Sequence, residues 1–128
     1  MNQFLWVCIG GAAGSGCRFL MSGWMANRFG TVFPYGTLGV NLLGSFLLGL
    51  IMQLSLATDL ISPNARLALT TGVLGGFTTY STFNYETIRF VDEGAWAVAA
   101  LNVGVTVVSC LVAGKAGVEL VNYLLKGA

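Results

Sequence analysis

Charged residues are scarce in this chain, and histidine is absent. Only 9% of the 128 residues are Asp, Glu, Lys or Arg, whereas 55% are hydrophobic. A soluble domain is usually about one quarter charged, so this chain cannot cover a water-facing surface, and we expect its solvent to be the lipid bilayer. The lack of histidine removes the commonest metal ligand and general base. The net charge of +1 gives no reason to expect nucleic acid as a partner.

The cysteines and carboxylates also offer no reactive centre. Cys8, Cys17 and Cys110 lie within apolar segments, and their spacing fits neither a zinc site nor a disulfide pattern. We interpret them as small apolar side chains. The carboxylates form no compact cluster along the sequence, and no nucleophile is paired with a base. The sequence therefore does not predict an enzyme.

Four apolar segments are long enough to cross a bilayer, which takes about 20 residues each. They cover approximately residues 4–24, 37–56, 65–91 and 95–115, and short links join them. We predict an all-α membrane protein with one four-helix transmembrane domain over residues 1–128. Pairs of glycines at GxxxG spacing, Gly10 with Gly14 and Gly72 with Gly76, are typical of closely packed membrane helices.

The basic residues hardly bias the orientation of these spans. Arg66, Lys115 and Lys126 would lie on one side of the membrane, and Arg28 and Arg89 on the other. Because an imbalance of Lys and Arg sets orientation, a nearly balanced chain could insert both ways. One copy of this size is also too small to enclose a pore. These features favour an antiparallel homodimer.

The third segment is interrupted by a polar stretch that opens on two glycines, residues 75–86. Glycine has little helical preference, and Ser and Thr side chains compete for the backbone. Unwound backbone at membrane depth survives only where protein buries it or where it lines a wet cavity. We predict a helix broken at Gly75–Thr78, beside a pathway or an ion.

Three of the segments carry polar side chains at helical spacing. Such side chains can join membrane helices by hydrogen bonds, but three converging stripes favour a hydrated or substrate-lined track. The stripes are Thr37, Asn41 and Ser45 in the second segment, Thr79, Thr82 and Glu86 in the third, and Asn102, Thr106 and Ser109 in the fourth.

Other side chains could determine which ion uses this track. Tyr80 and Phe83 share a helix face, and their rings would favour a small anion by their edges or a cation by their faces. Glu86 could pair with Arg89 within the helix. Arg18, in the first segment, could snorkel to the interface or stand at a pore mouth and concentrate anions.

These motifs resemble the microbial fluoride channels, the Fluc or CrcB family. The matching residues are Gly36-Thr37-Leu38-Gly39-Val40-Asn41-Leu42-Leu43-Gly44, then Gly75-Gly76-Phe77-Thr78-Thr79-Tyr80-Ser81-Thr82-Phe83 with Glu86, and Arg18 after a run of small residues. The resemblance covers nearly the whole chain. It implies passive fluoride efflux across the bacterial inner membrane through two pores of an antiparallel, dual-topology dimer.

The resemblance also implies roles for particular residues. Tyr80 and Phe83 correspond to an aromatic box along each pore, whose first position is usually Phe. The backbone carbonyls of Gly75 and Thr78 correspond to the ligands of a structural sodium ion. The remaining pathway positions correspond to Arg18, Asn41, Ser81, Thr82, Thr106 and either Ser109 or Cys110.

Two other functions are compatible with a small four-span chain. A small multidrug transporter would need a carboxylate in its first span, where Arg18 is the only charged residue. A non-transporting helical scaffold would explain the glycines but not the three polar stripes or the interrupted helix.

Overall fold

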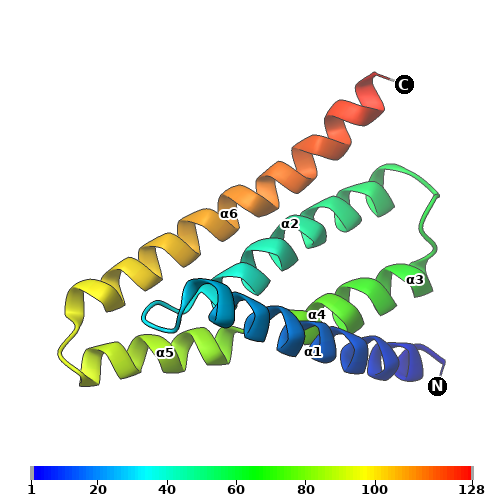
Figure 1. The fold of residues 1–128 in the computed structure, drawn as a ribbon. Helices are drawn as coiled ribbons and strands as arrows, with labels where there is room; N and C mark the ends of the chain where they lie inside the picture. Colours follow the sequence, from blue (N-terminus) through cyan, green and yellow to red (C-terminus); the bar gives the residue numbers. More distant parts are fainter. Residues whose placement is uncertain (1, 128) are drawn as a thin grey trace.

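The computed structural model describes residues 2–127 and confirms the all-α prediction. Three long helices cross the molecule: α1 (Asn2–Phe29), α2 (Tyr35–Ala57) and α6 (Trp96–Lys126). Shorter segments, joined end to end, make a fourth crossing, which follows α2 and precedes α6 in the chain (Figure 1). All three long helices are apolar enough, over enough residues, to cross a membrane.

The predicted interruption of the third segment is present, and its extended residues are Thr78 and Thr79. Before it come α3 (Pro63–Leu67), the π-helical segment η1 (Ala68–Leu74) and α4 (Gly75–Phe77), and after it comes α5 (Tyr80–Asp92). Thr78 has φ −81° and ψ 161°, and Thr79 has φ −152° and ψ 111°. Gly75 remains helical, with φ −62° and ψ −37°. The polar threonines, rather than the glycines, leave the helix.

Gly10, Gly14 and Gly76 lie within helices at positions where two backbones approach closely. A Cβ on Gly76 would lie 2.5 Å from the Gly11 carbonyl oxygen, and one on Gly10 would lie 2.8 Å from the Ala68 carbonyl oxygen. A Cβ on Gly14 would collide with the Val73 backbone. The interpretation of the GxxxG pairs as helix contacts is therefore confirmed, and α1 packs tightly on η1 and α4.

The helix bounds exceed the predicted spans at both ends of the chain. The first helix covers residues 2–29 rather than 4–24, and the last covers 96–126 rather than 95–115. Lys115 and Glu119 form an i,i+4 ion pair that supports the extension of α6. Glycines with positive φ follow α1 and α5, namely Gly30 at 86° and Gly94 at 75°, a conformation that glycine adopts at low cost.

Most large apolar side chains face outward, as expected for a protein whose solvent is lipid. The exposed ones include Phe19, Leu20 and Leu111, each at least 70% exposed. The buried apolar set is small: Val40, Leu74, Phe77, Phe83, Phe90, Ala99 and Val121. The interior holds four polar side chains as well, Thr37, Thr79, Asn102 and Thr106.

Candidate ion pathway at the helix break

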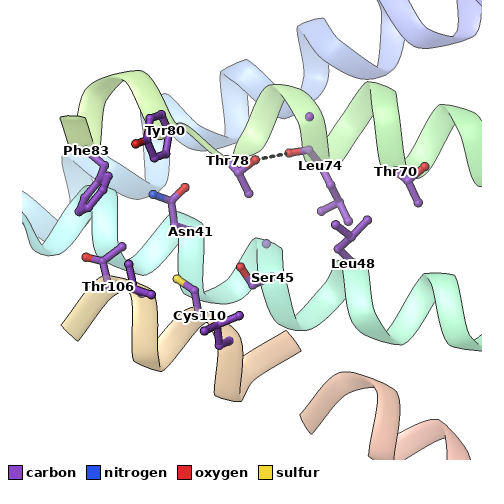
Figure 2. A pocket seen from close by; sticks show the side chains of 14 residues that line it. Asn41, Ser45, Leu48, Thr70, Leu74, Thr78, Tyr80, Phe83, Thr106 and Cys110 are labelled. Atoms are coloured by element: carbon purple, nitrogen blue, oxygen red, sulfur yellow. Dashed lines mark hydrogen bonds between the residues drawn. The ribbon is translucent and has the colours of Figure 1, made fainter. Parts of the chain in front are cut away.

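A cavity of about 480 Å³ lies beside the break in the third crossing. Side chains from α2, from the broken crossing and from α6 point toward it (Figure 2). This cavity gathers members of the α2 and α6 stripes, Asn41, Ser45 and Thr106, whereas the stripe of the third segment, Thr79, Thr82 and Glu86, lines a second cavity with Thr37. The lining residues with polar or aromatic groups include Asn41, Thr78, Tyr80, Phe83, Thr106 and Cys110.

Asn41 is bonded to the extended backbone of the break. Its Nδ2 donates to the Thr79 carbonyl oxygen at 3.0 Å, and its Oδ1 accepts from the Thr79 N–H at 2.8 Å. In an unbroken helix, that N–H would donate to the carbonyl four residues earlier, on Gly75. The side chain of α2 therefore replaces a hydrogen bond that the broken helix has lost.

Helix α1 contacts the same segment from another direction. The Arg18 guanidinium donates to the Thr78 carbonyl oxygen at 3.5 Å, and the Ser15 hydroxyl donates to that of Gly76 at the same distance. The sequence did not decide whether the Arg18 side chain snorkels to the interface or stands at a pore mouth. Its side chain reaches the break and also lines a second cavity of about 320 Å³.

Glu86 faces α2 and not Arg89, so the predicted intrahelical pair is wrong. The Thr37 hydroxyl donates to Glu86 Oε1 at 2.8 Å, whereas Arg89 Nε lies 3.6 Å from Glu93 Oε1. Arg89 pairs instead with Glu93 at the end of its helix, where both side chains are about half exposed. The other Glu86 oxygen is buried without a hydrogen-bond partner among residues 2–127. Glu86 lines the second cavity with Arg18 and Thr37.

The hydroxyls that follow the break gather around Thr79, which caps α5. Thr79 Oγ1 accepts from the Thr82 N–H at 3.2 Å and donates to Thr82 Oγ1 at 3.0 Å. The Ser81 hydroxyl lies 3.4 Å from the same oxygen. Thr79 and Thr82 line the second cavity, and Ser81 lies on the exposed surface outside the lining of both. These hydroxyls thus occupy the α5 side of the break.

The polar face of α6 reaches both α5 and the larger cavity. Asn102 Nδ2 donates to Thr87 Oγ1 at 2.9 Å, and the Thr106 hydroxyl donates to Asn102 Oδ1 at 3.5 Å. Cys110 lines the larger cavity, whereas Ser109 is outside its lining and has a buried hydroxyl without a partner in residues 2–127. Of the two candidates for this position, the structure turns Cys110 toward the cavity.

The two aromatic rings lie together at the cavity wall in different environments. Their centroids are 5.7 Å apart, and the ring planes are inclined by 57°. Phe83 is 8% exposed, whereas Tyr80 is 76% exposed. Phe83 is therefore fixed by packing within this chain, and most of the Tyr80 ring is available to a ligand or to another molecule.

Three residues of this region had no place in the sequence prediction. Ser15 bonds to the break, Thr87 binds Asn102, and Thr70 lines the larger cavity. Thr70 and Thr87 each donate a hydroxyl hydrogen bond to the carbonyl four residues earlier, a habit of Thr in helices. Sequence spacing does not mark Ser15, Thr70 or Thr87, because the residues that give them a place in the site lie on other helices.

The chemistry available at the break is that of neutral donors and backbone carbonyls. Within residues 2–127, no group of three or more Cys, Asp or Glu side chains could hold a metal ion. Amide and hydroxyl groups can donate to an anion, and carbonyl oxygens suit a hard cation. The arrangement can therefore hold small ions of either sign at different atoms.

Comparison with known proteins identifies the family. The family model described as "CrcB-like protein, Camphor Resistance (CrcB)" matches residues 5–118. A protein of Sorangium cellulosum (strain So ce56), named fluoride-specific ion channel FluC, is 50% identical over 99% of this chain and 100% of its own length. Proteins of the same name from Anaeromyxobacter sp. (strain K) and Geobacter sulfurreducens are 53% and 47% identical over 97% of this chain, and over 98% and 100% of their own lengths. This chain therefore belongs to the CrcB-like family.

Proposed function

We propose that this protein is a fluoride-selective ion channel that allows passive fluoride efflux across the bacterial inner membrane, which it crosses several times. The observation that carries the proposal is the end-to-end similarity, at about half identity, to proteins named fluoride-specific ion channels. HF crosses membranes by diffusion and ionises in a neutral cytoplasm, so a passive exit for the anion protects the cell. A channel of this kind performs no catalysis.

The cavity beside the break supports this function chemically. Fluoride is small and strongly hydrated, so a selective path must replace its water with well-placed donors. One N–H of Asn41 remains after its bond to Thr79, and Thr106, Tyr80 and Phe83 line the same cavity, where a ring edge would attract an anion. These groups carry no full charge. An ion can therefore enter without being bound too tightly to leave.

The pathway extends through the second cavity on the other side of Thr79. Arg18 there brings positive charge to the break, and Thr82, whose hydroxyl oxygen accepts from Thr79, keeps a hydroxyl hydrogen to donate. A cation at the edge of a low-dielectric path raises the local concentration of anions. Ser81 extends this hydroxyl cluster toward the surface, whereas Ser109 lies outside the lining of the larger cavity.

The channel works as an antiparallel, dual-topology homodimer with two pores. Within one chain, α2, the broken crossing with α5, and α6 line the larger cavity. The Tyr80 ring at this cavity remains largely exposed. A second copy would cover this apolar surface. The nearly equal numbers of Lys and Arg on the two sides allow both insertions.

Fluoride should leave proteoliposomes containing the protein at least ~100-fold faster than chloride, which corresponds to about 2.8 kcal/mol of selectivity at 1.4 kcal/mol per tenfold. The physical reason is that neutral donors at short range compensate for the lost hydration of a small anion better than for that of a larger one. Efflux is measured with fluoride and chloride electrodes on the same vesicles. Comparable rates for the two anions would refute the channel proposal, and a multidrug transporter or a scaffold would release neither.

A structural sodium ion at the centre of the dimer is part of the same proposal. The Gly75 carbonyl has lost its usual donor, because the Thr79 N–H is bonded to Asn41. The Thr78 carbonyl has only a long contact with Arg18, at 3.5 Å. Two antiparallel copies would supply four such oxygens to one axis. These residues fit the ion, which would supply a fixed positive charge between the carbonyls.

Removing sodium should therefore empty the site slowly and reduce fluoride efflux. Purified protein is held for days in a buffer whose only cation is N-methylglucammonium, and bound sodium is measured by atomic emission beside fluoride efflux. We expect both to fall together and to recover when sodium returns. Thr78→Ser should retain sodium, since the ligand is a backbone oxygen. Full efflux from protein that has lost all bound sodium would contradict a structural role.

A further inference from the structure

The extended backbone at Thr79 is the least supported part of the third crossing. Thr79 is only 7% exposed, and its φ and ψ of −152° and 111° place both of its peptide groups outside the helical ladder. A buried N–H or carbonyl without a partner costs about 1–3 kcal/mol. Two such groups on one residue would favour refolding of the break into a continuous helix.

Asn41 satisfies both groups at once. The two bonds between its amide and Thr79, at 2.8 and 3.0 Å, are the pattern by which one strand pairs with another. Figure 2 shows the Asn41 side chain between the break and the cavity. Because the oxygen must accept and the nitrogen must donate, these bonds also fix which way the amide is turned.

Helix α2 is held firmly enough to make this contact precise in position. Val40, beside Asn41, is fully buried. One turn further along, Gly44 leaves so little space that an added Cβ would collide with the Thr78 side chain. The backbone of α2 therefore lies directly against the break, and a side chain of the length of Asn spans the remaining gap.

We infer that Asn41 is a positioning residue whose amide holds Thr78–Thr79 extended and thereby aims its own remaining N–H into the cavity. An ion contact through that last N–H depends on the two bonds to Thr79. The consequence for transport rests on the proposed function, whereas the bonding to the break does not.

The inference is tested by hydrogen exchange of the Thr79 amide in the full-length protein. Deuterated protein labelled with ¹⁵N-threonine is prepared in detergent micelles, and the exchange rate is read from its NMR spectrum. In Asn41→Ala we expect exchange at Thr79 to be roughly tenfold faster, the loss expected for one net hydrogen bond. Asn41→Leu, which keeps the side-chain volume without polar atoms, should give the same result and covers the case in which the alanine variant fails to fold.

Two further variants separate positioning from a general loss of polarity. Ser45→Ala removes another polar group of α2 from the same cavity, one helical turn away, and should leave Thr79 exchange unchanged. Asn41→Asp keeps an oxygen that can accept from the Thr79 N–H but has no donor for the Thr79 carbonyl. We expect it to protect the Thr79 amide while moving the amide resonance of Tyr80, whose peptide group contains that carbonyl and which is read in a second sample labelled with ¹⁵N-tyrosine.

The outcomes distinguish this inference from the channel proposal. Thr79 exchange that is equally slow in wild type, Asn41→Ala and Asn41→Leu would overturn the positioning role, whatever the transport result. If exchange is faster in those variants but the wild-type protein releases no fluoride, the positioning role is kept and the channel proposal is refuted. If Ser45→Ala accelerates exchange as much as Asn41→Ala, the effect is unspecific and the inference fails.

Discussion

Replacing Gly14 by alanine should prevent the protein from reaching its folded state and so abolish fluoride efflux. A Cβ at this position would lie 3.0 Å from the Phe77 nitrogen and 2.9 Å from the Val73 carbonyl carbon, and closer still to the Val73 oxygen. These are backbone atoms of the broken crossing, which cannot rotate aside as a side chain can. We expect a cost at or above the upper end of the ~1–3 kcal/mol typical of overpacking.

Gly16→Ala is the matched control, since it adds the same methyl group to the same helix. Nothing lies within 4 Å of the position that its Cβ would occupy. Both substitutions gain about 1 kcal/mol of helix preference, so any difference between them reports packing. Folding is measured by size-exclusion profile and thermal unfolding in detergent. A monodisperse Gly14→Ala protein with the melting temperature of Gly16→Ala would show that α1 is free to move away from the break.

The architecture was largely predictable because few backbone structures are stable in a lipid bilayer. With so few charges, the only stable solution was a set of apolar helices, and their number follows from segment length. Close packing at Gly10 and Gly14 was also predictable from their spacing, whereas the partner, η1, is known only from the structure. The helix bounds were less so, because apolarity does not end a helix and the Lys115–Glu119 pair supports α6 beyond its apolar part.

The site was predictable in composition but not in pairing. Sequence spacing placed Thr37 and Glu86 on separate stripes without indicating that they bond to each other at 2.8 Å. It also offered Arg89 as a partner for Glu86, because neighbours along one helix are the only contacts that spacing reveals. The bonds of Asn41 to Thr79 were likewise hidden, since they depend on how closely α2 approaches the break.

The position of the break shows how tertiary contacts override local preference. Glycines have the weaker helical tendency, yet Gly75 and Gly76 remain helical, and α1 packs directly against Gly76. The threonines that follow have partners outside the helix: Asn41 for Thr79 and Arg18 for Thr78. The chain therefore breaks where other helices supply hydrogen bonds, and this requires the assembled structure.

Phe83→Ile should reduce fluoride efflux by up to roughly tenfold, because a single aromatic interaction is worth about 0.5–1.5 kcal/mol beyond burial and the ring lines the cavity. An aliphatic side chain has no positive edge to offer an anion. Tyr80→Phe, by contrast, keeps the ring and removes only an exposed hydroxyl, so it should remain active. Efflux is measured with a fluoride electrode from vesicles of equal protein content.

Phe90→Ile separates ring chemistry from loss of volume. Phe90 lies seven residues further along the same helix, is 5% exposed, and lies outside the lining of both cavities described here. The two substitutions remove the same atoms from equally buried positions, so both should lower the melting temperature. Only Phe83→Ile should slow fluoride efflux per folded molecule. If both slow it equally, the effect comes from packing of α5, and if neither does, the edge of Phe83 makes no contact with the ion that limits its passage.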